Sequence, residues 1–202
     1  MKKNVRIINI IMVLVMMLFL TSCLDDEVDG PIDSIRTEKL AVIRNQCSKF
    51  DDVTKITSSI TIYSGDVKVE YSNLTYDIND DVKFHSEKYT LNNDPYGELY
   101  VKTEFDQSLS KDDTFGKLSI VEFLKEENFI NRIYSITLDE SGGSVHGYLN
   151  PEVVKEVMGV ESTNGIDKVV IDLTCKDEKV DSYQLSYNHS GLKVVITYEY
   201  TY

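Results

Sequence analysis

Apolar and polar residues alternate along most of the chain after Lys55, as they do in strands that bury one face. The alternating stretches are residues 56–62, 67–71, 74–78, 82–84, 89–91, 99–105, 134–138, 145–149, 169–175, 183–187 and 192–200. Gly65-Asp66 and Ser190-Gly191 are typical of two-residue hairpin loops, and residues 92–97 form a longer turn. The pattern therefore predicts a meander of antiparallel strands.

Helical spacing appears before the alternating stretches and again late in the chain. An early apolar stripe follows a cap at Asp33 or Ser34, and it consists of Ile35, Leu40, Ile43, Cys47 and Phe50. A later helix is predicted from Asn150 as N-cap, Pro151 in the first turn and Gly159 just past the end. Between the strands, residues 106–114 are predicted to be a polar connection, and residues 120–124 a short helix or lip. The order predicts an α+β fold, mostly antiparallel β, with its helices on one side of the sheet.

The N-terminus has the order of features found in a secretory signal peptide. Three basic residues within the first six precede an apolar run from Ile10 to Leu20. The run ends in Leu20-Thr21-Ser22-Cys23, which looks like a bacterial lipobox, whose cysteine receives diacylglycerol and becomes the new N-terminus. An uncleaved transmembrane anchor is the first alternative, but the segment is shorter than the roughly 20 apolar residues that a span needs. A signal peptide without lipidation is the second.

Cleavage before Cys23 would divide the chain into a signal peptide (1–22), an acidic tether (23–32) and a single β-rich domain (33–202). The removed part carries three basic and no acidic residues, so the formal charge changes from −13 to −16. Such a charge repels nucleic acid, which excludes it as a partner, and gains nothing from anionic lipid headgroups. We therefore expect acyl chains on Cys23 to hold the protein at the extracytoplasmic face of the cell membrane.

Two cysteines remain after Cys23. Cys47 and Cys175 form an even pair, and outside the cytoplasm such a pair can persist as a disulfide. Two buried thiols that act as small apolar residues are the alternative. The sequence leaves both interpretations open.

Two segments carry a resemblance to a known group of proteins. They are Tyr148-Leu149-Asn150-Pro151-Glu152-Val153-Val154-Lys155-Glu156-Val157-Met158-Gly159 and the closing Gly191-Leu192-Lys193-Val194-Val195-Ile196-Thr197-Tyr198. With the early helix and the long meander, residues 33–202 resemble the half-barrel lipoproteins of the LolA and LprG type. The resemblance implies a curved, half-barrel-like sheet with a few helices on its concave side. It also implies a concave apolar face that holds an acyl chain or another hydrophobe.

No catalytic or metal motif accompanies this pattern. His85, His146 and His189 are scattered, and Ser144 lacks the second glycine of a serine elbow, because His146 stands two residues after it. An EF-hand reading of residues 77–88 fails, because Val82 replaces the required glycine and Lys88 the final glutamate. We expect no enzyme, cofactor or metal. The sequence favours a lipoprotein that binds or carries a lipid or another hydrophobic ligand; the alternative is a structural or protein-interaction lipoprotein with a fully packed core and no ligand.

Overall fold

The computed structural model describes residues 34–49, 52–97, 99–111, 114, 120–121, 123–138, 142–153, 155, 162–166 and 168–202. The predicted signal peptide, Cys23 and the acidic tether lie outside these residues. None of the helices within this part of the chain combines the length and the apolar character needed to cross a membrane.

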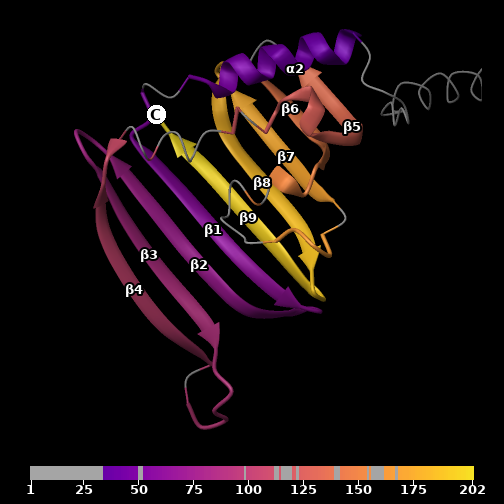
Figure 1. Ribbon diagram of the computed structural model, residues 1–202. Helices are drawn as coiled ribbons and strands as arrows, with labels where there is room; N and C mark the ends of the chain where they lie inside the picture. The colour runs from indigo at the N-terminus through magenta and orange to yellow at the C-terminus, as the bar shows by residue number, and fades with distance from the viewer. Residues whose placement is uncertain are drawn as a thin grey trace, which may run out of the picture.

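The described residues form one open, curved sheet of nine antiparallel strands (Figure 1). The strand order is β4-β3-β2-β1-β9-β8-β7-β6-β5. The strands are β1 (Lys55–Ser64), β2 (Val67–Ile78), β3 (Val82–Leu91), β4 (Tyr100–Leu109), β5 (Phe129–Leu138), β6 (Gly142–Leu149), β7 (Val169–Lys176), β8 (Lys179–His189) and β9 (Leu192–Thr201). This architecture confirms the predicted half-barrel-like, mostly antiparallel fold.

The first and last strands pair in the middle of the sheet. The β1–β9 ladder runs from Lys55 opposite Thr201 to Ser64 opposite Leu192. Two meanders extend from this centre, β2–β4 on one side and β8 back to β5 on the other. We call β2, β3 and β4 the open wing. Residues 110–128, which we call the crossing segment, connect the open wing to β5 and include the short 3-10 helix η1 (Glu126–Asn128).

Alternation along the strands places the apolar residues on one face, which we call the core face. Its buried members are Ile56, Val145, Leu149, Val169, Ile171, Leu173, Cys175, Val180, Tyr183, Leu185, Tyr187, Val194, Ile196, Tyr198 and Tyr200. Thr114, Ile120, Phe123 and Leu124 of the crossing segment are also buried. Each fully buried aliphatic or aromatic side chain contributes roughly 1.5–3 kcal/mol to folding, so this half of the sheet carries the main core.

The helix α2 (Ser34–Cys47) lies across the ends of β5–β8 (Figure 1). Leu40, Ile43 and Cys47 fall on one side of α2 and are buried, which confirms the predicted apolar stripe over these residues. Gly143 of β6 allows the close approach. A Cβ atom there would lie 2.8 Å from a Leu138 methyl carbon and 3.3 Å from Cδ1 of Ile43.

The predicted turns and the late helix start are found where the sequence placed them. Gly65 and Gly191 have φ of 59° and 78°, values that glycine adopts without strain. The backbone amide of Glu152 donates to Oδ1 of Asn150 at 3.1 Å, which confirms Asn150 as an N-cap. Residues 154 and 156–158 of the predicted late helix lie outside the described residues.

The prediction for residues 106–109 was wrong. They continue β4 to Leu109 instead of forming a connection. Asp106, Gln107 and Ser108 are all exposed. An edge strand tolerates polar residues at every position because neither face has to be buried, so apolar alternation does not detect its end.

Candidate functional site

Aromatic side chains cross the core face from the packed half of the sheet to the open wing. This aromatic row consists of Tyr183 (β8), Tyr198 and Tyr200 (β9), Tyr76 (β2), Phe84 (β3) and Phe105 (β4). The rings of Tyr183 and Tyr198 stack with centroids 4.8 Å apart. On the open wing the centroids of Tyr76 and Phe84 are 4.9 Å apart, and those of Phe84 and Phe105 are 6.2 Å apart. In the strand register Tyr183 is directly opposite Tyr198, and Tyr76 is directly opposite Phe84. Phe105 is diagonal to Phe84, and Ile56 of β1 lies between Tyr200 and Tyr76. One apolar surface therefore continues across the sheet.

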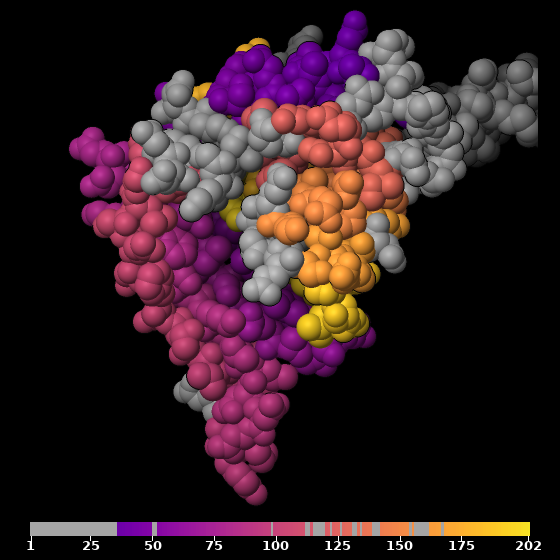
Figure 2. All heavy atoms as spheres, in the orientation of Figure 1, coloured from indigo at the N-terminus to yellow at the C-terminus, as the bar shows by residue number. Residues whose placement is uncertain are grey.

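Exposure rises along the aromatic row. Tyr183 is 3% exposed in the core, Tyr76 and Phe84 are half-buried, and Phe105 at the edge is 55% exposed. Val101, on the same face of β4, is 53% exposed. Figure 2 looks onto the core face and shows a hollow between the rose residues of the open wing and the orange part of the chain. The open wing therefore presents apolar side chains to solvent beside a packed core.

A buried hydroxyl group lies in the floor of the core face. Ser58 of β1 is 5% exposed and stands in register between Tyr198 and Leu74. Its Oγ makes no hydrogen bond of ordinary geometry among the described residues, and the hydroxyl of Tyr198 is the polar group with which it interacts. Because buried hydroxyl groups normally have a partner, Ser58 can bind a water molecule or the polar group of a ligand.

The core face of the open wing becomes more polar towards one end. Burial raises the pKa of Tyr76 to about 12, so its hydroxyl stays protonated and can donate at neutral pH. Further along the same face, Nζ of Lys88 lies 2.9 Å from Oε2 of Glu70. This ion pair bounds the apolar surface, which therefore suits a molecule with an apolar body and a polar end.

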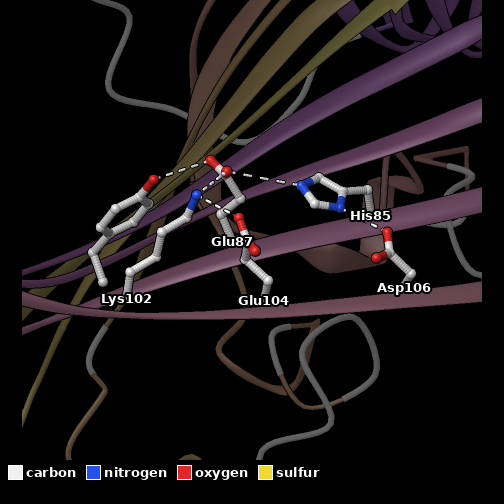
Figure 3. Close-up of polar contacts among 6 residues, drawn as sticks. His85, Glu87, Lys102, Glu104 and Asp106 are labelled. Atoms are coloured by element: carbon white, nitrogen blue, oxygen red, sulfur yellow. Dashed lines mark hydrogen bonds and ion pairs between the residues drawn. The ribbon is translucent and has the colours of Figure 1, made fainter.

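The opposite face of the sheet, which we call the outer face, carries charged residues on β3 and β4 (Figure 3). Nζ of Lys102 lies 2.6 Å from Oε1 of Glu87 and 2.5 Å from Oε1 of Glu104. The bond from Lys102 lowers the pKa of Glu87. Nδ1 of His85 lies 2.7 Å from Oδ1 of Asp106, and this bond raises the pKa of His85. These charged groups therefore pair with one another at the solvent-facing surface of the sheet.

Three tyrosines lie beside these charged residues on the outer face. The rings of Tyr71 and Tyr89 are parallel within 7° with centroids 4.4 Å apart, and Tyr100 meets Tyr71 edge-on at 5.4 Å. The hydroxyl of Tyr100 donates to the backbone oxygen of Lys68 at 2.8 Å, and Nζ of Lys68 lies 4.7 Å from the Tyr71 ring. The rings pack on one another, and the arrangement stabilises the open wing.

A second histidine–aspartate pair lies on the outer face, between His146 of β6 and Asp172 of β7. Asp172 also lines a shallow polar depression of about 280 Å³. A histidine–carboxylate pair is part of the machinery for proton transfer, which further requires a nucleophile or substrate aligned with the imidazole. Ser144 on the same strand shares a hydrogen bond of 2.7 Å with Thr137. The absence of enzyme activity stays a prediction.

Comparisons with known proteins give a likeness in fold. No model of a known protein family matches the chain, and no curated protein matches it. Its structure is similar to that of LprF from Mycobacterium bovis. The two share 11% identity with a TM-score of 0.43, over 81% of this chain and 92% of LprF. A likeness of this size does not tell which ligand or partner this chain has.

The structure brings the two predicted cysteines together. Sγ of Cys47 in α2 lies 3.6 Å from Sγ of Cys175 in β7, and both residues are buried free thiols here. The hydrogen bond to Cys175 and burial raise the pKa of Cys47, so the thiol is protonated at neutral pH. Disulfide formation by this pair stays a prediction.

Sequence reasoning missed the outer-face pairs. His85 and Asp106 are 21 residues apart, and His146 and Asp172 are 26 apart. Each pair is directly opposite across two neighbouring strands. The alternating pattern shows that all four residues share the polar face, but only the strand register shows which carboxylate meets which imidazole. Among the described residues, no group of three or more His, Cys, Asp or Glu is arranged to hold a metal ion.

Proposed function

We propose that the protein binds or carries a lipid or another hydrophobic ligand on the core face of its open wing. The observation that supports this most directly is the continuation of the aromatic row beyond the packed core. Apolar side chains of β2, β3 and β4 are half-buried or exposed where the same face of β7–β9 is closed. Exposed apolar surface next to a core is typical of ligand and partner sites.

The arrangement fits an elongated amphiphile. An apolar chain would lie along Leu74, Tyr76 and Phe84 and cover side chains that now contact water. Each buried methylene contributes about 0.8 kcal/mol. The polar end would reach either the Ser58 hydroxyl in the floor or the Lys88–Glu70 pair at the margin.

We further propose that residues 1–22 are a signal peptide and that Cys23 carries the acyl chains that anchor the protein outside the cytoplasmic membrane. Cys23→Ser should then abolish lipid attachment and leave an uncleaved or soluble protein. The measurement is membrane fractionation with intact mass spectrometry of the purified chain. Normal processing and membrane retention of the Cys23→Ser variant would contradict this proposal.

Ligand binding is tested by two neighbouring substitutions on β3. Phe84→Lys places a charge in the aromatic row, whereas His85→Lys places it one residue away on the outer face. The full chain, purified in detergent and then delipidated, is titrated with a fluorescent fatty acid such as cis-parinaric acid. We expect Phe84→Lys to weaken binding at least roughly tenfold, equivalent to about 1.4 kcal/mol, and His85→Lys to leave it unchanged.

Native mass spectrometry of the parent protein provides a second measurement, with co-purified lipid as the expected result. Melting curves establish that both variants are folded. If Phe84→Lys does not fold, Leu74→Lys is used in its place. Equal affinity of the folded core-face variant and the parent protein would exclude this site.

The packed half of the sheet favours a second function. The core face of β6–β9 is filled by its own side chains together with α2 and the crossing segment. A protein that relied on this core alone would serve as a structural or interaction lipoprotein without ligand. Absence of bound lipid and of fatty-acid binding would support that alternative.

A further inference from the structure

The strand β4 forms one edge of the sheet (Figure 1). It pairs with β3 over ten positions without a register shift, and within the described residues no strand pairs with its other side. Every residue from Val101 to Ser108 is exposed. The outward backbone amide and carbonyl groups of a strand of this length can accept another strand.

The two edges of the sheet differ. At the opposite edge, β5 pairs with β6 through register shifts between Phe129 and Ile133 and between Ile133 and Ser135, and α2 contacts β5. Irregular pairing and a covering helix protect an edge from adding strands. The regular β4 edge has neither among the described residues, and it contains no proline.

The sequence of β4 is complementary to itself in an antiparallel arrangement. A two-fold axis perpendicular to the sheet keeps each face on its own side, so opposing residues must belong to the same face. With the axis at Thr103, Lys102 lies opposite Glu104 of the second copy on the outer face. On the core face, Val101 lies opposite Phe105 of the second copy, which covers the two half-exposed apolar residues of the edge.

Three neighbouring centres are less favourable. An axis at Lys102 or Glu104 places identical charges opposite each other, and an axis at Phe105 opposes Glu104 to Asp106. Like charges directly opposite in an antiparallel pair are destabilising. We propose that β4 is the interface of a homodimer in which two copies pair antiparallel about Thr103, joining their sheets into one.

This pairing has a consequence for the core face. The aromatic row of each copy ends at Phe105, and the two rows would meet across the axis. Lys102 can keep its ion pair with Glu87 of the same chain in the dimer, because Glu87 lies on β3, away from the free edge. The dimer needs no bound ligand.

Cysteine substitution locates the axis directly. In the full chain in non-ionic detergent, Thr103→Cys places two thiols opposite each other with Cβ atoms about 4.5–5.5 Å apart, so oxidised glutathione should convert the chain into a disulfide-linked dimer. Gln107→Cys, on the same face four residues away, should not cross-link. The parent chain with its own cysteines is the background control. An equal yield at both positions, or none above background at Thr103→Cys, would overturn the proposed register.

Charge exchange tests the interface independently of added thiols. Lys102→Glu places two glutamates opposite each other across the axis and should therefore separate the dimer. The mass of the protein particle, measured by light scattering and corrected for bound detergent, should fall from twice the chain mass to the single-chain mass. The double variant Lys102→Glu with Glu104→Lys restores opposite charges and should restore the dimer. Lys83→Glu, outside the paired stretch, should remain dimeric. A monomeric parent protein, or a double variant as monomeric as Lys102→Glu, would refute the interface.

Discussion

The charge state of His85 depends on a neighbour on the adjacent strand. Its Nδ1 contacts the carboxylate of Asp106, and Glu87 lies on its other side with Oε1 3.9 Å from Nε2. Both carboxylates favour the imidazolium. The pair is solvent-exposed, so its contribution to folding is small.

We predict that the pKa of His85 lies above the ordinary value of about 6.5 and falls when Asp106→Asn removes the charge. A pKa raised by folding adds stability below the unfolded value, and this stability is lost as pH rises through the folded value. NMR titration of the imidazole measures the shift. Asp172→Asn, which alters only the other histidine–aspartate pair, should leave His85 unchanged, and an unshifted His85 in the Asp106→Asn protein would contradict the assignment.

Gly191 gives a second prediction at the residue scale. Its φ of 78° is unfavourable for other residues, and a Cβ atom there would meet nothing within 4 Å. Gly191→Ala should therefore destabilise the fold by roughly 1–2 kcal/mol through backbone strain alone. Urea unfolding measures the difference. Ser190→Ala is the matched control, because Ser190 already adopts a φ of 52° and should tolerate alanine.

At the scale of secondary-structure elements, α2 is attached to the sheet mainly through one apolar side. Leu40, Ile43 and Cys47 make this contact, and Cys47 meets Cys175 near the end of β7. Salt bridges near the same end link Lys49 to Glu178 and Lys179 to Asp52, at 2.8 and 2.9 Å. These exposed ion pairs are worth little, so packing and the thiol pair determine how firmly α2 is held.

We predict that a disulfide donor such as oxidised glutathione joins Cys47 to Cys175, with two electrons and two protons passing to the donor. Closing a loop of this length contributes roughly 4–5 kcal/mol in the loop-entropy account. A reductant should therefore lower the melting temperature of the oxidised parent protein. It should have no effect on the Cys47→Ala, Cys175→Ala double variant. Rapid alkylation of both cysteines after unfolding without reductant would show that the bond does not form.

For the whole molecule, the alternating pattern was sufficient to predict most strands, several turns and an antiparallel sheet, whereas the curved, half-barrel-like shape was implied by the family resemblance. It did not distinguish the two faces of β2, where Tyr71 faces outward and Tyr76 inward, because both faces carry apolar residues. It also could not place Cys47 beside Cys175 or Phe84 beside Phe105. Such neighbours depend on strand order and register, which are set by contacts between residues far apart in the chain.

The central β1–β9 ladder determines when the molecule can finish folding. The meander β1–β4 and the hairpins of β5–β8 can form as they are synthesised, because each new strand pairs with the one before it. Their union requires β9, which is synthesised after β8, and contacts between strands as far apart in the sequence as β1 and β9 form slowly. Until β9 pairs with them, β1 and β8 each have an unpaired edge, so a newly synthesised chain is most vulnerable to aggregation just before this ten-residue strand is available.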